Sequence, residues 1–194
     1  MNIILKQLFQ QEIVNCIKNN EYYLYEEDGT FHISTTCLTS IDLKHRDSLI
    51  GLFLPFIERF NPSSIVALSE GIDQGVTILT TWIGLKSERP FFIYNLDEPR
   101  PLTEISSNLS DCMVLIPYLN NKKQFLSYLK FILNSGATPK LIICIFQETD
   151  EDFKNICNNK HIYFQTVFCL KNIILQLEEH KDFTEKLKRN RLKF

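Results

Sequence analysis

Two clusters of charged side chains are the first candidates for chemistry. Lys122 and Lys123 are adjacent and precede a helix-like segment, so they could attract an anion, although positive charge at a helix start opposes the helix dipole. Asp150, Glu151 and Asp152 follow an apolar run and could hold a divalent cation, but consecutive carboxylates are also typical of a solvated helix start. We interpret both clusters as solvated surface groups.

The C-terminal segment 181–194 is strongly basic. Cations near a helix C-terminus complement its dipole, which is the interpretation we favour. The alternative is contact with RNA or a membrane surface, but only Phe183 and Phe194 offer rings for stacking, so this signal is weak. The basic residues are Lys181, Lys186, Lys188, Arg189, Arg191 and Lys193.

Nucleophile and metal motifs are missing from the sequence. The six cysteines form no CxxC pair and have no histidine at metal-ligand spacing, so we expect reduced, structural thiols. Cys144 and Cys169 lie in apolar runs, where a cysteine is usually a small buried hydrophobe. Ser69 lacks a GxSxG setting, and the histidines have no paired nucleophile. The histidines are His32, His45, His161 and His180.

Composition limits the protein class. A chain of 194 residues with a net charge of −2 does not coat nucleic acid through its charge. The N-terminal stretch lacks the apolar core and cleavage site of a signal peptide, and no run approaches the roughly 18 apolar residues of a membrane span. We therefore expect a soluble, cytoplasmic protein. The six glycines are less than half the usual share of about 7%, which weighs against a phosphate-binding loop of bare backbone.

The first third of the chain predicts an α+β unit. Apolar residues at near-helical spacing indicate a helix over 3–20, and Asp28-Gly29 between two aromatic, alternating stretches indicates a hairpin. A further helix is expected over 46–60, despite Pro55.

Short apolar strands then alternate with helices, which is typical of a parallel sheet covered on both faces. We expect one α/β domain over 1–194, with a helix-and-hairpin hood at 1–45, a core at 46–180 and a basic tail at 181–194. The expected strands are 65–68, 91–94, 113–116, 141–146 and 163–168, and the helices are 72–83, closing near Gly84, then 121–134, 150–158 and 171–189.

Four stretches in this order resemble the type I phosphoribosyltransferases, and most of all orotate phosphoribosyltransferase. They are IVALSEGIDQGVTIL at 65–79, GLKSERPFFIY at 84–94, MVLIPYLNNKKQFLSYLKFILNSGAT at 113–138 and HIYFQTVFCLKNII at 161–174. The resemblance covers the chain to about residue 178 and implies the phosphoribosyltransferase fold.

The family motif for phosphoribosyl pyrophosphate (PRPP) has diverged. In the family, two carboxylates hold the ribose hydroxyls, and a loop rich in glycine and hydroxyl residues wraps the 5′-phosphate. By the resemblance, the carboxylate positions fall on Pro117 and Tyr118. The loop positions fall on Asn120, Asn121, Lys122, Lys123 and Gln124, and none of these is glycine, serine or threonine.

Two further family features are also altered. The basic positions of the flexible loop fall on Tyr94 and Asn95, and acids follow, while Arg89 and Arg100 lie off the motif and are interpreted as surface residues. The pyrophosphate loop corresponds to Ser69, Glu70 and Gly71, where Glu70 puts negative charge in the place of an anion. Gly71 is interpreted as a tight turn, and Gly75 as a site of close helix–sheet packing.

The resemblance therefore implies a phosphoribosyltransferase-like protein with eroded PRPP and pyrophosphate sites. We expect a non-catalytic protein that binds a ligand, possible ligands being small anions, or a protein partner, including a second copy of itself. We assign no catalytic or metal-binding residue and no cofactor, and expect neither membrane nor nucleic-acid binding. The alternative is a divergent but active orotate or nucleobase phosphoribosyltransferase of nucleotide metabolism, which would use magnesium.

Overall fold

A parallel five-stranded sheet forms the centre of the computed structural model, which describes residues 3–19, 24–27, 30–39, 43–69, 74–96, 109–148 and 153–179. The strand order within the described residues is β4-β3-β5-β6-β7. The strands are β3 (Ile65–Ser69), β4 (Phe91–Asn95), β5 (Ser110–Leu119), β6 (Thr138–Gln147) and β7 (Tyr163–Cys169). The α/β class with a parallel sheet is confirmed.

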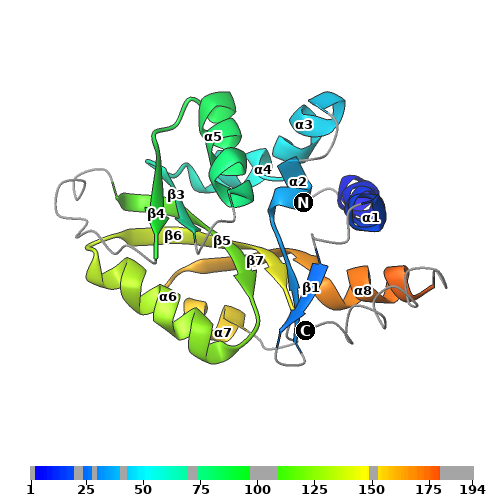
Figure 1. Cartoon of the computed structure of the whole chain (residues 1–194). Coiled ribbons are helices and arrows are strands. Elements are labelled where there is room, and N and C mark those ends of the chain that lie inside the picture. Colours follow the sequence, from blue (N-terminus) through cyan, green and yellow to red (C-terminus); the bar gives the residue numbers. More distant parts are fainter. Residues whose placement is uncertain are drawn as a thin grey trace.

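Helices cover both faces of this sheet (Figure 1). One face packs against α1 (Ile3–Asn19), α2 (Thr36–Thr39), α3 (Leu43–Ile50), α4 (Leu54–Phe60), α5 (Gly75–Ser87) and α8 (Leu170–Glu178). The other face packs against α6 (Lys122–Asn134) and α7 (Phe153–Asn158). The apolar runs of β5 and β6 are buried because both of their faces are covered.

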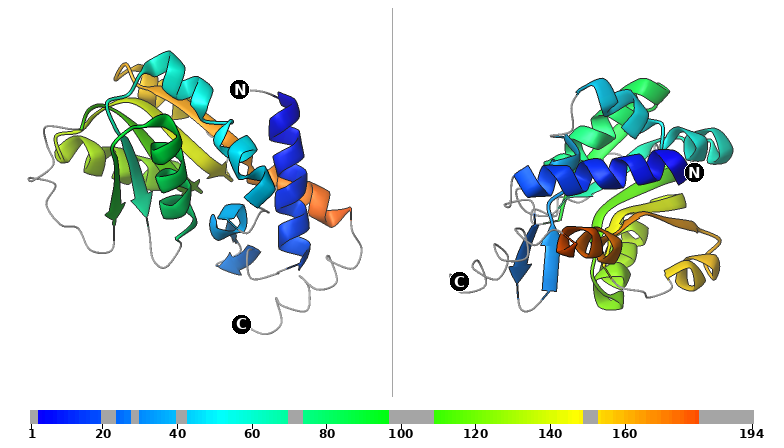
Figure 2. Two further views of the ribbon diagram at one scale, coloured as in Figure 1. Left: turned by 90° about the horizontal axis from the view of Figure 1, so that it is seen from above. Right: turned by 90° about the vertical axis from the view of Figure 1, so that its right-hand side faces the viewer.

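The predicted hairpin is present as β1 (Leu24–Glu27) and β2 (Thr30–Ile33), which pair antiparallel. Asp28 and Gly29, on which the prediction rested, lie outside the described residues. The helix α1 packs against α8 on the outside of the fold, and both views of Figure 2 place the two helices side by side. None of the described helices is long and apolar enough to cross a membrane.

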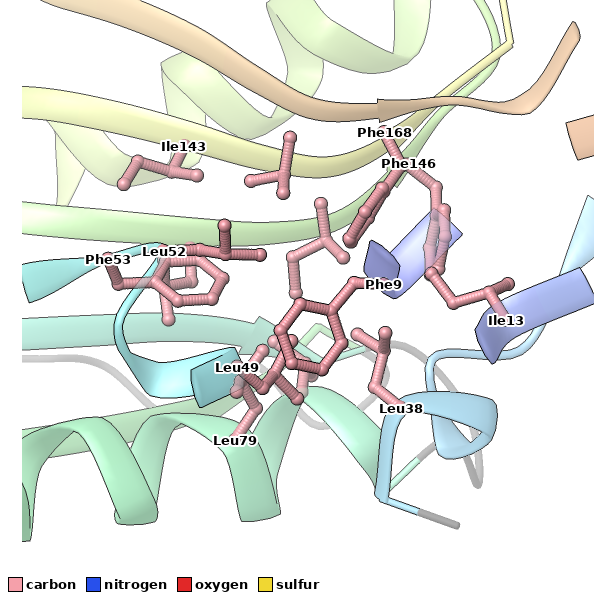
Figure 3. Packing of buried hydrophobic residues seen from close by; sticks show 14 of the residues in the cluster. Phe9, Ile13, Leu38, Leu49, Leu52, Phe53, Leu79, Ile143, Phe146 and Phe168 are labelled. Carbon is pink, nitrogen blue, oxygen red and sulfur yellow. The ribbon is translucent and has the colours of Figure 1, made fainter. Parts of the chain in front are cut away.

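The larger apolar cluster connects α1 directly to the sheet. Figure 3 shows Phe9 and Ile13 of α1 near Phe146 of β6 and Phe168 of β7. The rings of Phe146 and Phe168 stack with centroids 5.6 Å apart. One hydrophobic core therefore runs from α1 to the strands without interruption.

Several predicted boundaries were wrong. The helix expected over 46–60 is two helices, α3 and α4, because the chain turns at 51–53 and Pro55 occupies the first turn of α4. Gly84 does not close α5, which continues to Ser87. A Cβ atom at Gly84 would lie 2.5 Å from Cδ1 of Phe91, so this glycine permits the helix to pack closely on β4.

The ends of two other predicted helices fall partly outside the described residues. The helix expected over 150–158 is described as α7 from Phe153, and residues 150–152 lie outside the described part. Likewise α8 is described to Glu178, with the residues from 180 onward outside it.

Candidate functional site at the carboxyl edge of the sheet

The strand order changes direction between β3 and β5. From β3 the chain crosses to β4 on one side, then returns to β5 on the other side and continues outward to β6 and β7. Ligands of open α/β sheets bind at such a switch point. The residues that end these strands are Ser69 of β3 and Leu119 of β5.

A closed set of hydrogen bonds occupies the turn from β5 into α6. Asn121 caps the helix, since its Oδ1 accepts the backbone N–H of Gln124 at 2.9 Å. In return, Oε1 of Gln124 accepts the backbone N–H of Asn120 at 3.0 Å. This exchange is a variant of the capping box, and it engages two backbone amides of the turn with side chains of the turn itself.

Gln124 is held from its other end as well. Its Nε2 donates to the hydroxyl of Tyr128 at 2.7 Å, and Tyr128 is buried against the sheet. The amide of Gln124 therefore joins the turn to the second turn of α6. Beside it, Oδ1 of Asn120 is buried and has no hydrogen-bond partner.

The two positions to which the resemblance assigned the family carboxylates hold buried, uncharged side chains. Pro117 and Tyr118 are both buried in β5. The pairing of β5 with β3 ends at Leu115, two residues before Pro117, so the missing N–H of this proline lies beyond that ladder. The Tyr118 hydroxyl donates to Oε2 of Glu148 at 2.5 Å.

Glu148 brings a carboxylate to this edge that the sequence reasoning missed. Its backbone N–H donates to the carbonyl of Leu119 at 2.9 Å, which places it directly after β6 and beside the end of β5. Its position immediately after a predicted strand of a parallel sheet was the available signal.

An open depression of about 320 Å³ lies alongside the first two turns of α6. Its lining residues are Asn120, Asn121, Lys123, Gln124, Ser127 and Tyr128. The structure therefore brings four of the predicted loop positions together around one hollow and adds Ser127 and Tyr128, which the sequence reasoning had not selected. Lys122 is exposed in the same turn but does not line it.

Tyr94, to which the resemblance assigned a basic position of the flexible loop, is packed into the fold. Its ring meets the edge of Phe131 of α6, with centroids 6.4 Å apart. Burial, and secondarily Cys112, raises the pKa of Tyr94, and its hydroxyl is buried without a partner. Asn95 is exposed at the end of β4.

The two arginines near this loop do not form a site among the described residues. The Arg89 guanidinium donates to Oδ1 of Asn61 at 2.5 Å. Arg89 precedes β4 and Asn61 precedes β3, so this hydrogen bond lies at the amino edge of the sheet, opposite the depression. Arg100 lies outside the described residues.

The pyrophosphate-loop positions are only partly described. Ser69 is buried at the end of β3, and its carbonyl accepts the N–H of Leu96 at 2.8 Å. Glu70 and Gly71 lie outside the described residues. Beyond them, Gly75 begins α5 against the backbone of Thr35, so the close packing expected at Gly75 is present but its partner is the N-terminal segment and not the sheet.

Thiols and metal ligands add no further site in the described part of the chain. All six cysteines are free; four are buried, while Cys16 and Cys169 are only partly buried, which corrects the expectation for Cys169. No group of three or more histidine, cysteine, aspartate or glutamate side chains is placed to hold a metal ion there. Asp150, Glu151 and Asp152 lie outside the described residues.

Comparison with solved structures identifies the fold. Orotate phosphoribosyltransferase from Aeropyrum pernix superimposes with a TM-score of 0.59 at 12% identity, over 86% of this chain and 99% of the other. A phosphoribosyltransferase from Corynebacterium diphtheriae gives 0.59 at 10% identity, over 84% and 97%. The UMP synthase of Leishmania donovani gives 0.59 at 10% identity, over 92% of this chain and 42% of that longer one.

Sequence comparison adds no closer relationship. No protein-family model matches the chain, and no curated protein matches its sequence. The structural comparisons show that the chain has the type I phosphoribosyltransferase fold. Their identities of 10% and 12% show the fold alone.

Proposed function

We propose that this chain uses the type I phosphoribosyltransferase fold as a binding scaffold, without phosphoribosyl transfer. The single observation that carries the proposal is the exchange of hydrogen bonds between Asn121, Gln124 and the backbone of Asn120. It lies where the family fold would need bare amides to hold a phosphate.

The physical reason is competition for the same donors. A phosphate at a helix N-terminus is held by backbone N–H groups that point at it, with no side chain between. Here Asn121 and Gln124 supply acceptor oxygens to two of these N–H groups, so a phosphate would first have to displace both. Each such bond contributes about 0.5–1.5 kcal/mol, and the displaced amide oxygens would then need new donors.

The two positions that the resemblance assigns to the ribose-binding carboxylates also lack the groups needed to hold PRPP. Tyr118 presents a phenol that is already bonded to Glu148, and Pro117 presents no polar side-chain atom. Neither residue can accept two ribose hydroxyls as a carboxylate does. Because both the phosphate contacts and the ribose contacts are missing, we expect that the protein does not bind PRPP.

The depression beside α6 is the place where we expect a ligand. Lys123 supplies a cation, Ser127 a hydroxyl, and Asn120 a buried oxygen without a partner. A small molecule that carries both an anionic group and an N–H or O–H donor would match these three groups.

Calorimetric titration with PRPP and magnesium tests the proposal. We expect no binding tighter than about 1 mM, which corresponds to roughly −4 kcal/mol. The variant Gln124→Gly frees the N–H of Asn120 and is expected to bind PRPP more tightly than the wild type, whereas the exposed neighbour Lys130→Gly leaves binding unchanged. Wild-type binding tighter than this limit would contradict the proposal.

The alternative function is a divergent transferase, favoured by the presence of a hollow and of Lys123 at the edge where the fold family binds its substrates. It predicts pyrophosphate release from PRPP and magnesium in the presence of orotate or another nucleobase. Turnover above the enzyme-free rate, lost in a Lys123→Ala variant, would support this alternative. A panel of nucleobases without turnover would exclude it.

A further inference from the structure

The outward face of α6, which lies on the outside of the sheet (Figure 1), presents lysine and leucine side chains to solvent. Lys122, Lys123 and Lys130 are exposed, Leu126 is 43% exposed and Leu133 is 37% exposed. The helix itself contains no acidic residue. None of the described residues forms an ion pair with these lysines, so their charge is uncompensated in this part of the chain.

The opposite face of α6 already fixes the helix on the sheet. Its buried side chains are Phe125, Tyr128, Leu129 and Ile132. The ring of Phe125 also packs against that of Phe153 of α7, with centroids 4.8 Å apart. The outward face is therefore carried by an immobilised element, which keeps the entropy cost of binding a partner low.

Four of the exposed residues have the spacing of a helix–helix seam. Lys123, Leu126, Lys130 and Leu133 are separated by three, four and three residues, the intervals at which positions a and d recur in a coiled coil. Residues at these intervals lie on one stripe of a helix. The stripe, which we call the α6 seam, therefore alternates lysine at position a with leucine at position d.

We infer that the α6 seam binds an acidic amphipathic helix of a partner protein. Such a helix carries a carboxylate where α6 carries lysine, and an aliphatic side chain where α6 carries leucine. In a parallel pair, each carboxylate meets a lysine and each aliphatic side chain meets a leucine. Of the four seam residues, only Lys123 also lines the depression, so this surface is distinct from the proposed ligand site.

The charge of the seam favours this occupant. Lys122 and Lys123 lie in the first turn of α6, where positive charge opposes the helix dipole. A partner carboxylate at that turn would interact favourably with both the ammonium groups and the helix N-terminus. A second copy of the same seam would set lysine against lysine, which is repulsive.

The leucines argue against two other classes of partner. A nucleic acid would contact the lysines through its phosphates but would leave Leu126 and Leu133 in water. A membrane-surface helix binds by burying its apolar face in the lipid, and the apolar face of α6 is already buried on the sheet. A helix that supplies both carboxylates and aliphatic side chains satisfies both kinds of residue in the seam.

The small size of the seam sets the strength of binding. Exposed ion pairs contribute little and are screened by salt, and only two leucines are covered. We expect a dissociation constant on the order of 100 micromolar at about 50 mM salt, and weaker binding at about 300 mM salt.

Fluorescence anisotropy of a labelled synthetic helix with the full chain tests this inference. The probe is a peptide of about 21 residues, built of alanine and glutamine with glutamate at each a position and leucine at each d position. Its control peptide has lysine in place of every glutamate. We expect the glutamate peptide to bind, and the lysine peptide not to bind at protein concentrations up to about 1 mM.

A charge swap tests whether the seam itself is the binding surface. The double variant Lys123→Glu, Lys130→Glu should bind the glutamate peptide at least about tenfold more weakly and should now bind the lysine peptide. The gained binding shows that the variant is folded. The matched control is Lys160→Glu, Lys171→Glu, which changes the net charge equally at exposed residues outside α6 and should bind the glutamate peptide as the wild type does.

The apolar half of the seam is tested separately. The double variant Leu126→Ala, Leu133→Ala should weaken binding of the glutamate peptide about tenfold at both salt concentrations. Circular dichroism checks that this variant is folded, and unchanged binding would overturn the assignment of the leucines.

Three results would overturn the inference as a whole. They are a wild type that does not bind the glutamate peptide, a charge-swapped variant that binds it unchanged, and an equal loss in the control at positions 160 and 171. Binding of the wild type to phosphatidylcholine vesicles that contain phosphatidylserine, without binding of the peptide, would assign the lysines to a membrane surface instead.

Discussion

Gly75 of α5 lies against the backbone of Thr35. A Cβ atom at position 75 would lie 2.1 Å from the carbonyl carbon of Thr35 and 2.3 Å from its carbonyl oxygen. Thr35 is fully buried, and the backbone around it cannot retreat into solvent. The start of α5 and the segment before α2 therefore fit together only because residue 75 has no side chain.

The variant Gly75→Ala should destabilise the protein. Overpacking against backbone costs typically about 1–3 kcal/mol, and contacts this short favour the upper end. Urea unfolding measures the loss. The adjacent Gln74→Ala, at an exposed residue whose side chain makes no cap bond, should change the free energy of unfolding by less than about 0.5 kcal/mol. Equal stabilities of Gly75→Ala and wild type would show that the segment before α2 can move away.

Gln124→Ala should cost more stability than a surface substitution in the same helix. It removes the acceptor for the N–H of Asn120 and the donor to Tyr128, for an expected loss of about 1–2 kcal/mol. Asn121→Ala removes the cap itself, at about 1 kcal/mol. Thermal unfolding measures both. Lys123→Ala is the exposed control, and a loss there as large as that of Gln124→Ala would contradict the assignment.

The hydrogen bond from Tyr118 to Glu148 should be measurable as a coupling energy. A double-mutant cycle with Tyr118→Phe and Glu148→Ala should give a coupling energy of about 0.5–3 kcal/mol, because the two groups are in direct contact. The matched cycle of Tyr118→Phe with the distant Arg89→Gln should be additive. Additivity in the first cycle would mean that the bond contributes nothing to folding.

Stability should fall at alkaline pH because three buried thiols stay protonated in the fold. Burial raises the pKa of Cys112 and Cys157 to about 12 and raises that of Cys144 well above its ordinary value of 9.0. The unfolded chain therefore releases these protons first. These three thiols leave stability unchanged well below pH 9, where they are protonated in both states, and they lower it as the pH rises from 9 toward 12.

Urea unfolding at about pH 8 and about pH 10.5 measures this effect. Cys157→Ala should reduce the loss between the two pH values, even if its stability at the lower pH is also reduced. If Cys157→Ala loses as much unfolding free energy between the two pH values as the wild type does, groups other than Cys157 cause the loss.

Thiol modification should divide the cysteines into two sets. Iodoacetamide at about pH 8, followed by mass spectrometry, should label Cys16 and Cys169 in the folded protein and leave the four buried thiols unmodified. Cys16 should react slowly, because burial, and then Glu12, raises its pKa. All six should react in urea. Rapid labelling of Cys112 or Cys144 without urea would contradict their burial.

Apolar patterning made most of the sheet predictable. The five expected strands all exist, and the helix expected over 121–134 is α6, which ends at Asn134. Ser135 is its C-cap, and Gly136 follows at a φ of 80°, a conformation that glycine adopts without strain. The run at 141–146 is buried because both faces of the sheet are covered there, whereas the run at 163–168 belongs to the edge strand β7 and is only partly buried.

The hydrogen bonds and close contacts of the candidate site could not be predicted, because they depend on contacts that no local sequence pattern encodes. Gln124 is an ordinary polar residue in the sequence, and its role arises from Asn120 and Tyr128, which the fold places around it. The partner of Gly75 lies 40 residues away in the sequence, and a glycine alone does not say what approaches it. Glu148 needed the register of β5 and β6 before its carboxylate could be placed beside Tyr118.

The contact between α1 and α8 also has a consequence during synthesis. A ribosome makes α1 long before β7 and α8, against which it packs. Phe9, Ile13 and Ile17 therefore have no complete partner surface while the chain is still being elongated. The apolar face of α1 therefore lacks its full partner surface until β7 and α8 have left the exit tunnel, and during that time it is a segment at which aggregation can begin.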